Sequence, residues 1–343
     1  MFLKEDNKLF EVFLSIKEKY KLEIVDSHIH PLDVLGIHKN NSVGEKKIYH
    51  LKPSLLEYLE HGRLSLFFLK LLFQYQPSLI QETILKTYQR AGKKQLLYEL
   101  NRAGIDKGIL LPVLPYVSAD EISSAYEGEK FVCLGSVDVC RITPEEVERI
   151  ILEQINKFNI KGIKLHPNIQ GFYPQPSFNN RNVAESLKKI YKVAEENRLY
   201  LLFHAGYSYL FDKDGQGRKI EYAKLENFCN HEGKSELFGK YNIPIILAHM
   251  GSYQVAYPNF QLLQAISQSY RNVYFDTTGI SPKIISKAVE IIGSDRIIFG
   301  TDAFYNNIKH SLLLVLKALK DARTEESFEE KVVQVFSKNY QRL

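Results

Sequence analysis

The chain has 343 residues, with 45 Lys and Arg against 40 Asp and Glu, ten His and three Cys. Its 45% hydrophobic and 25% charged residues are ordinary for a folded globular protein and exclude a disordered chain. The formal charge of +5 is small and the basic residues are scattered, so we expect neither nucleic acid nor a membrane as a partner. An odd number of cysteines without a CxxC pair implies no disulfide framework.

Two segments bear on the compartment in which the protein works. The stretch from Lys4 to Lys8 is wholly polar and leaves no room for the apolar core of a signal peptide. The most apolar segment, Leu64 to Phe73, is interrupted by Lys70 and is far shorter than the roughly 20 residues that span a bilayer. We therefore predict a cytoplasmic protein with reduced thiols.

Short apolar runs alternate with amphipathic stretches along the chain from Leu22 onward. Most of the runs are continuously apolar, as is typical of parallel strands that are covered on both faces. The eight strand candidates are Leu22–Val25, Gly108–Val113, Phe131–Val139, Lys161–Leu165, Tyr200–Phe203, Ile243–Ala248, Asn272–Phe275 and Arg296–Phe299. Helical patterns lie between them at Thr143–Phe158, Val183–Asn197, Asn259–Tyr270, Ser281–Ile292 and His310–Lys320. The first of these begins with Thr143 followed three residues later by Glu146, which predicts a capping box. This alternation predicts βαβ units and a parallel sheet.

Eight such units form a (β/α)8 barrel, the TIM barrel, which is the α/β fold that we predict. An open doubly wound sheet is the runner-up, weakened because no Gly-x-Gly-x-x-Gly follows the first strand. The surplus length lies in a helical insertion after strand one (31–100), with apparent helices at Ser54–Tyr75 and Gln81–Ala103, and in a second insertion after strand five (207–241). Both would cover the carboxyl ends of the strands, so we expect a single domain over 1–343 with lids.

Half of the histidines follow predicted strands, and one aspartate follows the last strand. These residues are His28, His30, His166, His204 and His249, with Asp302. A barrel gathers all strand ends around one mouth, and residues two apart on a strand point the same way. Histidine nitrogens with a carboxylate and one open position make a catalytic metal site. Alone, His28 could cap a loop and His30 could be a core residue, but the six positions together favour the metal site. The other five histidines fall in loops or on helical surfaces without partners: His38, His50, His61, His231 and His310.

The motifs around these positions resemble the successive signatures of the amidohydrolase superfamily. They are DSHIH at 26–30, GIKLHP at 162–167, FHAG at 203–206, LAHMG at 247–251 and FGTD at 299–302. More narrowly, the chain is similar to the amidohydrolase-related (amidohydrolase 2) branch, which includes metal-dependent hydrolases and aminocarboxymuconate-semialdehyde decarboxylase-like enzymes. The resemblance extends from Leu22 to Leu343 and is specific for the superfamily but not for a substrate.

The resemblance implies that four residues surround a divalent ion and that His249 is the catalytic histidine. The four implied ligands are His28, His30, His204 and Asp302. In some members the strand-four lysine is carboxylated and bridges two ions, with the histidines of strands five and six on the second ion. In the branch that this chain resembles most, a Lys-Leu-His-Pro strand accompanies one ion, so we favour one over two. Lys164 and His166 remain candidates for a second metal or for substrate, and Lys164 could instead simply pair with Asp302. We expect zinc first, with manganese, iron and nickel as alternatives.

A bound divalent ion lowers the pKa of water from about 15.7 to about 7. Asp302 could then accept the water's proton while His249 stabilises the developing oxyanion. We therefore predict a metal-dependent hydrolase that cleaves an amide, ester or lactone of a small molecule. The alternative is a non-oxidative decarboxylase of an unsaturated or aromatic carboxylic acid, in which His249 or metal-bound water protonates the carbon that loses CO2. A third hypothesis is a catalytically inactive barrel that binds a partner. Such a protein would have no chemical need for the four implied ligands together with His249.

Aromatic and basic residues follow several strand ends and are candidates for contacts with a small-molecule substrate. Aromatic side chains there could stack on a planar ring or could pack under the lids. They are Phe172, Tyr173, Tyr207, Tyr253, Phe304 and Tyr305, of which we favour Tyr173, Tyr207 and Phe304. Arg141 could bind a carboxylate or be a solvated loop residue. Asp276 could orient a neighbouring ligand or begin a turn. By analogy with other barrel enzymes, we expect a homodimer.

Overall fold

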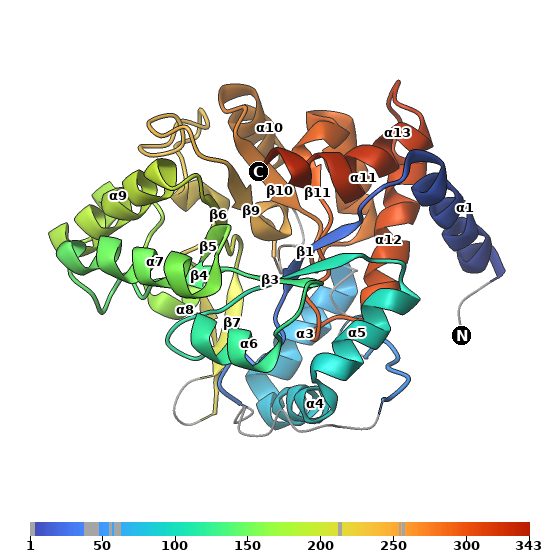
Figure 1. The fold of residues 1–343 in the computed structure, drawn as a ribbon, viewed down its shortest axis with the longest axis horizontal. Coiled ribbons are helices and arrows are strands. Elements are labelled where there is room, and N and C mark those ends of the chain that lie inside the picture. Colours follow the sequence, from blue (N-terminus) through green and yellow to red (C-terminus); the bar gives the residue numbers. More distant parts are fainter. Residues whose placement is uncertain are drawn as a thin grey trace.

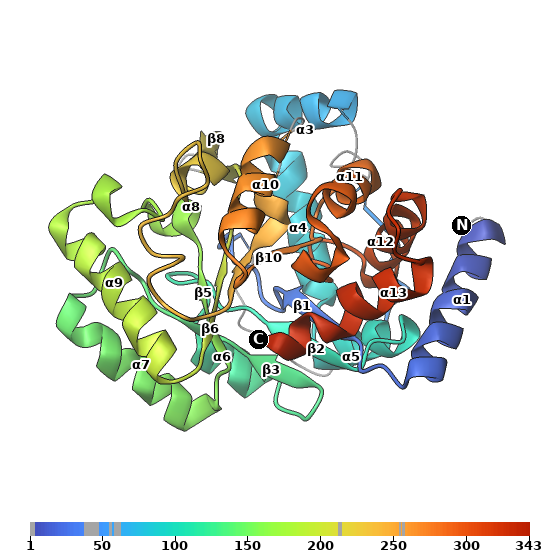
Figure 2. The same ribbon diagram turned by 90° about the horizontal axis from the view of Figure 1, so that it is seen from above.

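The computed structural model describes residues 4–37, 48–54, 57, 63–211, 215–253, 255 and 258–343. Parallel strands lie at the centre of the molecule, and helices lie around them (Figures 1 and 2). The strands are β1 (Val25–Ile29), β2 (Lys107–Leu110), β3 (Phe131–Cys133), β4 (Gly135–Ser136), β5 (Gly162–Leu165), β6 (Tyr200–Phe203), β9 (Ile245–Leu247), β10 (Val273–Asp276) and β11 (Ile297–Ile298).

The order of the parallel strands follows the chain. One sheet has the order β1-β2-β3 and the other β4-β5-β6-β9-β10-β11. Only Leu134 separates β3 from β4. At the other junction, Ser27 N donates to Phe299 O at 3.1 Å and Asp302 N donates to His28 O at 2.8 Å, so β1 lies beside the chain around β11. The strands therefore follow one another in barrel order, although their pairing is not continuous around the ring.

The predicted strands overlap with the observed ones, and the fifth predicted strand, Tyr200–Phe203, matches β6 in both bounds. The predicted run Phe131–Val139 divides into β3 and β4. The first strand begins at Val25, where the prediction had it end. Its residues Asp26, Ser27 and His28 are polar, so a search for apolar runs misses a strand whose polar side chains are buried against the site.

Helices pack outside the strands. They are α1 (Lys4–Tyr20), α6 (Ala119–Ala125), α7 (Pro144–Phe158), α9 (Arg181–Glu196), α10 (Phe260–Ser269), α11 (Pro282–Ile292), α12 (Ile308–Asp321) and α13 (Phe328–Val333). The prediction omitted α1, which packs against α12 and α13. The start of α7 follows its predicted capping box, since Thr143 N donates to Glu146 Oε2 at 2.8 Å. None of the helices in the described part of the chain is long and apolar enough to cross a membrane.

Side-chain alternation along the strands separates the barrel interior from the layer under the helices. Leu201 and Phe203 belong to the large core cluster with the helices, whereas Tyr200 and Leu202 belong to a smaller cluster. The smaller cluster has members from most strands: Val25, Ile109, Leu111, Leu134, Tyr200, Leu202, Ile246, Ala248, Tyr274 and Ile298. Side chains two residues apart on a strand point to the same face. His204 therefore shares the interior face of Leu202, and Asp276 shares that of Tyr274.

Two insertions lie over the carboxyl ends of the strands. The first contains α3 (Arg63–Tyr75), α4 (Pro77–Arg90) and α5 (Lys93–Arg102), and the second contains the antiparallel hairpin of β7 (Ser208–Phe211) and β8 (Gly217–Ile220). The predicted helix Gln81–Ala103 is in fact two helices, because Ala91 is extended and Gly92 is the non-helical N-cap of α5. The predicted helix Ser54–Tyr75 is described continuously only from Arg63, and 55–56 and 58–62 lie outside the described residues.

The two insertions touch each other. The Phe73 ring of α3 stacks on Tyr209 and Phe211 of β7, with ring centroids 5.2 and 5.6 Å apart. Gln81 Nε2 of α4 donates to Gly215 O at 3.3 Å. We call α3, α4 and the β7–β8 hairpin together the lid.

Candidate active site

The buried carboxylate of Asp26 connects the first strand of the barrel to the turn after the last strand. Asp26 Oδ1 accepts hydrogen bonds from His28 N at 3.2 Å and Thr301 N at 3.0 Å, and Asp26 Oδ2 accepts one from Thr301 Oγ1 at 2.5 Å. Burial raises the pKa of Asp26 to about 7, although these hydrogen bonds oppose the rise. Asp26 thereby holds the first strand, which carries His28 and His30, against the turn that carries Asp302.

His28 and His30 present lone pairs to the same point. His28 Nδ1 lies 2.8 Å from Asp276 Oδ2, and His30 Nδ1 lies 3.2 Å from Leu111 O. Burial lowers the pKa of both rings well below the usual value, so both are neutral. Because their Nδ1 partners are acceptors, each ring carries its proton on Nδ1 and keeps a lone pair on Nε2. The two Nε2 atoms are 3.2 Å apart, where neither can donate, and a cation between them would satisfy both.

Asp302 completes this group. Its Oδ1 lies 3.8 Å from His28 Nε2 and 3.7 Å from His30 Nε2, and it is buried without a hydrogen-bond partner. One ligand atom from each of the three residues lies within 4.8 Å of the others. Two imidazole nitrogens and an unpartnered carboxylate oxygen are a donor set for a divalent ion. The residues present therefore fit the metal that the sequence implies.

A second group of hydrogen-bonded side chains lies beside the first. His249 Nε2 is 3.1 Å from His204 Nδ1, and His249 Nδ1 is 2.8 Å from Thr278 Oγ1, which in turn donates to Asp276 Oδ1. Asp276 Oδ1 also accepts from His249 N at 2.6 Å, while Oδ2 accepts from His28. Asp276 thus connects His249 to the ring of His28, which is the orienting role that the sequence suggested for it.

The structure separates His204 from the other three implied ligands. Its Nδ1 faces His249, and its Nε2 lies 2.9 Å from Ser208 Oγ, on the first residue of the lid hairpin. Among the residues that the structure describes, His28, His30 and Asp302 are the ones gathered closely enough to share an ion. Ligation of the metal by His204 therefore stays a prediction.

Lys164 and His166 lie in the same interior. Lys164 is fully buried, and its Nζ has no hydrogen-bond partner, so a direct pair with Asp302 is not formed. Burial lowers the pKa of Lys164, and the charges of Asp276 and Asp302 oppose this. His166 stacks on His204 with centroids 4.0 Å apart, and its Nδ1 accepts from Ile169 N at 3.3 Å. The preference for one metal over two stays a prediction.

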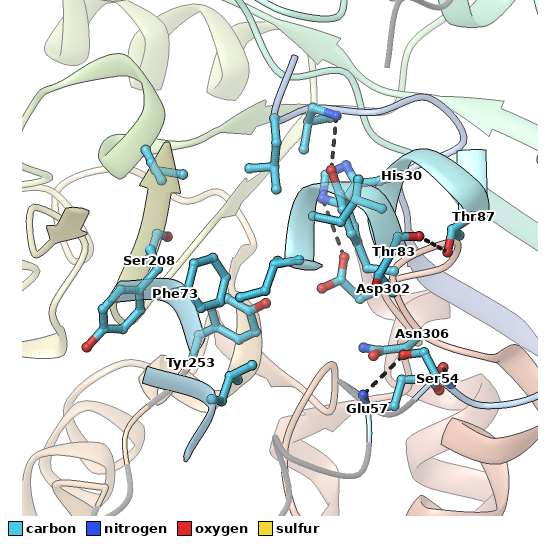
Figure 3. A pocket seen from close by; sticks show the side chains of 18 of the residues that line it. His30, Ser54, Glu57, Phe73, Thr83, Thr87, Ser208, Tyr253, Asp302 and Asn306 are labelled. Carbon is cyan, nitrogen blue, oxygen red and sulfur yellow. Dashed lines mark hydrogen bonds and ion pairs between the residues drawn. The ribbon is translucent and has the colours of Figure 1, made fainter. Parts of the chain in front are cut away.

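A pocket lies between these polar groups and the lid (Figure 3). One part of its wall is aromatic or aliphatic and the other is polar. Apolar and aromatic lining residues are Val34, Leu35, Leu69, Phe73, Ile80, Ile84, Tyr209, Leu210, Tyr253 and Tyr305. Polar lining residues are His30, Ser54, Glu57, Thr83, Thr87, His166, His204, Ser208, His249, Asp302 and Asn306.

The favoured substrate-binding candidates do not line this pocket. The Tyr173 ring packs edge-on against Phe178 and Tyr222, and Lys219 Nζ lies 4.0 Å from the ring centre of Tyr207. Phe304 is buried against Tyr88. The Arg141 side chain is 70% exposed and lies 3.4 Å from Asp138 Oδ2. Tyr253 and Tyr305, which also follow strands, do line the pocket, so position after a strand does not by itself identify its lining residues. A role of the four favoured candidates in substrate binding stays a prediction.

Residues that the sequence did not single out supply most of the outer wall. Phe73, Thr83 and Thr87 come from lid helices whose apolar pattern does not say what they cover. Glu57 could have been found from the sequence, because Ser54 and Glu57 have the spacing of a capping box. Both hydrogen bonds of that capping box are present in the structure.

Two of the histidines that were expected to have no partner do have one. His50 lies 3.0 Å from Tyr98 Oη, and His310 also has a partner. His38 and His61 lie outside the described residues.

The structure is similar to solved TIM-barrel proteins. An uncharacterised TIM-barrel protein from Bordetella bronchiseptica shares 15% identity with a TM-score of 0.58, covering 94% of this chain and 98% of that one. A 5-carboxyvanillate decarboxylase from Novosphingobium aromaticivorans, complexed with manganese and 4-hydroxy-3-methoxy-5-nitrobenzoic acid, shares 19% identity with a TM-score of 0.54, covering 84% and 89%. The 5-carboxyvanillate decarboxylase of Sphingomonas paucimobilis shares 15% identity with a TM-score of 0.52, covering 94% and 98%. These likenesses confirm the predicted TIM-barrel fold.

Sequence comparison identifies the family. No curated protein matches the chain. The profile of the family described as Amidohydrolase matches residues 116–334, which is more than half of the chain. The matched region contains His166, His204, His249 and Asp302. His28 and His30 precede it in the sequence but lie beside Asp302 in the structure. The chain therefore belongs to the amidohydrolase family.

Proposed function

We propose that the protein is a metal-dependent non-oxidative decarboxylase of aromatic or unsaturated carboxylic acids. The observation that carries the proposal is a buried donor set for a divalent ion at one end of a pocket with aromatic and aliphatic walls. Similarity to two decarboxylases of a substituted benzoic acid supports it. The family alone is compatible with the hydrolase that we expected first, but this pocket favours the alternative.

His28, His30 and Asp302 would hold the ion. When bound, a divalent ion supplies positive charge that binds substrate oxygen atoms and stabilises the negative charge that develops as CO2 leaves. We expected zinc first from the sequence. Manganese is the better first ion to test, because a similar structure holds it together with a benzoic acid.

Decarboxylation replaces a carbon–carbon bond by a carbon–hydrogen bond, so the chain must deliver a proton to the carbon that loses CO2. His249 and Asp302 both line the pocket. Burial lowers the pKa of His249 to about 3, so its ring is neutral at physiological pH and is a poor acid. Burial raises the pKa of Asp302, although the charge of Lys164 opposes the rise. His249 would therefore serve as a neutral hydrogen-bonding group, and Asp302 would carry the proton on the carboxylate oxygen other than Oδ1, which faces the two histidines.

The pocket walls would orient the substrate and exclude water. Phe73 and Tyr253 lie on the aromatic side of the pocket, where they can contact the face or edge of a planar ring (Figure 3). The lid helices add Leu69, Ile80 and Ile84. Exclusion of water favours protonation of carbon by a side chain over attack by hydroxide, which is the step that a hydrolase needs.

The test is a comparison of the two chemistries on one preparation. Manganese-loaded protein is incubated with hydroxylated benzoic acids and, separately, with lactones and aryl esters, and CO2 and organic products are quantified. We expect CO2 release, with one deuterium incorporated at the vacated carbon in heavy water, and no activity after chelation. Ring opening or ester cleavage without CO2 would refute the decarboxylase and restore the hydrolase.

A further inference from the structure

The end of the pocket away from the histidines carries a buried carboxyl group. Glu57 is 4% exposed and lines the pocket beside Ser54 and Asn306. In Figure 3 these three residues group together, with Asp302 between them and His30. No step proposed above uses Glu57.

Backbone donors hold this carboxyl group in place. Glu57 Oε1 accepts from Ser54 N at 2.6 Å, and Glu57 Oε2 accepts from Asn307 N, at the start of α12, at 2.8 Å. Glu57 N donates in return to Ser54 Oγ at 3.3 Å. The first insertion is thus fastened to the barrel through Glu57, and the carboxyl group has little freedom to move out of the pocket. Each of its oxygens keeps a further lone pair for a donor on a ligand.

The charges around the pocket are unequal at its two ends. Among the described residues that line it, the carboxyl groups are Asp302 and Glu57, and there is no lysine or arginine. Asp302 belongs to the proposed metal end, where a bound ion would supply positive charge and the buried Lys164 lies nearby. Glu57 has no such counterpart within the pocket. Arg141, the cation that the sequence offered for a substrate carboxylate, lies on the surface paired with Asp138.

We propose that Glu57 is a specificity-determining residue that admits ring substituents with a hydrogen-bond donor and excludes a second carboxylate at the end of the substrate away from the metal. The inference rests on the proposed function and narrows its substrate class to aryl monocarboxylic acids with a hydroxyl or amino group at that end. A hydroxyl can donate to a free lone pair of Glu57, whereas a carboxylate there would face like charge without a cation to pair with.

Cations outside the pocket could instead bind a second carboxylate of the substrate, which is the arrangement opposite to the one proposed. An adjoining outer pocket shares Glu57 and is also lined by Lys52, Lys86 and Arg90. Lys86 pairs with Glu82 at 2.6 Å, and the Arg90 guanidinium lies 5.5 Å from the ring centre of Tyr49. A substrate long enough to pass Glu57 could place a carboxylate among these exposed cations. That possibility predicts the opposite preference and is one outcome of the test.

The experiment compares two substrates that differ only at the remote position. These are 2-hydroxybenzoic acids with either a hydroxyl or a second carboxylate para to the reacting carboxylate. The kcat/KM ratio is measured for the manganese-loaded wild type and for Glu57→Gln. Because burial raises the pKa of Glu57 to about 7, the assay is run at pH 8, where the group is ionised. We expect the wild type to prefer the hydroxyl compound by at least about tenfold and Glu57→Gln to lose most of that preference.

Two further variants separate the effect of charge from an effect on folding. Glu153→Gln makes the same chemical change on α7, where the side chain is 62% exposed, and should retain the wild-type ratio. Asn306→Asp adds a carboxyl group beside Glu57 and should increase the preference, so the inference stays testable even if Glu57→Gln folds poorly. Equal ratios in the wild type, Glu57→Gln and Asn306→Asp would overturn it, as would a dicarboxylate preference abolished by Lys52→Gln or Arg90→Gln.

Binding measurements distinguish this inference from the proposed function. If no variant releases CO2 from either compound, the decarboxylase proposal fails, but the dissociation constants of both compounds can still be measured by calorimetry. Tighter binding of the hydroxyl compound, lost in Glu57→Gln, would then still support the role of Glu57. Equal dissociation constants would overturn it.

Discussion

The floor of the pocket and its lid are built in different ways. At the floor, His28, Asp276 and Asp302 come from strand ends separated by most of the chain, and direct hydrogen bonds fix their positions. In the lid, α3 and the β7–β8 hairpin meet mainly through the rings of Phe73, Tyr209 and Phe211.

This difference indicates a division of labour. Hydrogen bonds at the floor set the protonated nitrogen of each ring and the direction of its lone pair, so a small change there should alter the chemistry. Ring stacking in the lid is less directional and sets the size and polarity of the space above. Substitutions at the floor should therefore affect metal binding, and substitutions in the lid should affect substrate binding. Four predictions test this division.

The largest effect is expected at Asp302. Asp302→Asn keeps the shape but removes the charge of a proposed ligand and the proposed proton donor. We expect loss of bound metal and an activity decrease of more than about 100-fold, since even indirect partners of a metal are worth about 10–100-fold. Elemental analysis and CO2 release measure both, with Asp120→Asn on α6, whose side chain is 59% exposed, as the matched control. Full metal content in Asp302→Asn would contradict the assignment.

The next largest effect is expected at Asp276, which orients two rings without belonging to the proposed ligand set. Asp276→Asn places an amide N–H against His28 or against the donors around His249, so one of these hydrogen bonds is lost. We expect metal affinity to fall about 10–100-fold, as for other partners of ligating histidines. Competition with a chelator measures the affinity, and an unchanged value would show that Asp276 has no orienting role.

A smaller and different effect is expected in the lid. Phe73→Ala removes the ring that lines the pocket and stacks on Tyr209 and Phe211. Aromatic pairs are worth about 0.5–1.5 kcal/mol, so we expect KM to rise up to about tenfold with unchanged metal affinity. The control is Phe68→Ala on the same helix, where the side chain is 55% exposed. Loss of metal in Phe73→Ala would abolish the distinction between floor and lid.

The smallest effect concerns the pH dependence of stability at the floor. Burial raises the pKa of Asp26 to about 7, so between about pH 4 and 7 the folded state binds more protons at this position than the unfolded state. The contribution of Asp26 to the free energy of unfolding therefore falls as pH rises through this range. Asp26→Asn removes that slope and should gain at least about 1 kcal/mol relative to wild type between pH 5 and 8, one pKa unit being worth about 1.4 kcal/mol. Urea unfolding of both metal-free proteins measures the difference, and parallel pH profiles would refute it.

Local sequence patterns predicted the barrel better than the insertions. Continuous apolar runs and the capping box at Thr143 depend on neighbouring residues, and the structure confirms them. The break at Ala91–Gly92, which divides one predicted helix into α4 and α5, interrupts an otherwise helical pattern. The first strand was predicted at Leu22–Val25 but lies at Val25–Ile29. Its polar residues did not appear as part of an apolar run, because they are buried by contacts with residues as distant as Asp276 and Thr301.

The same contrast holds within the site. The sequence by itself determined that His28, His30, His249 and Asp302 would lie at strand ends on one side of a barrel, because alternation along a strand is a local property. Only the tertiary structure decided which ring nitrogens keep lone pairs, that His204 faces His249, and that Glu57 lines the pocket. These features depend on partners up to 250 residues apart, such as Glu57 and Asn307, whose approach is set by the packing of the whole chain.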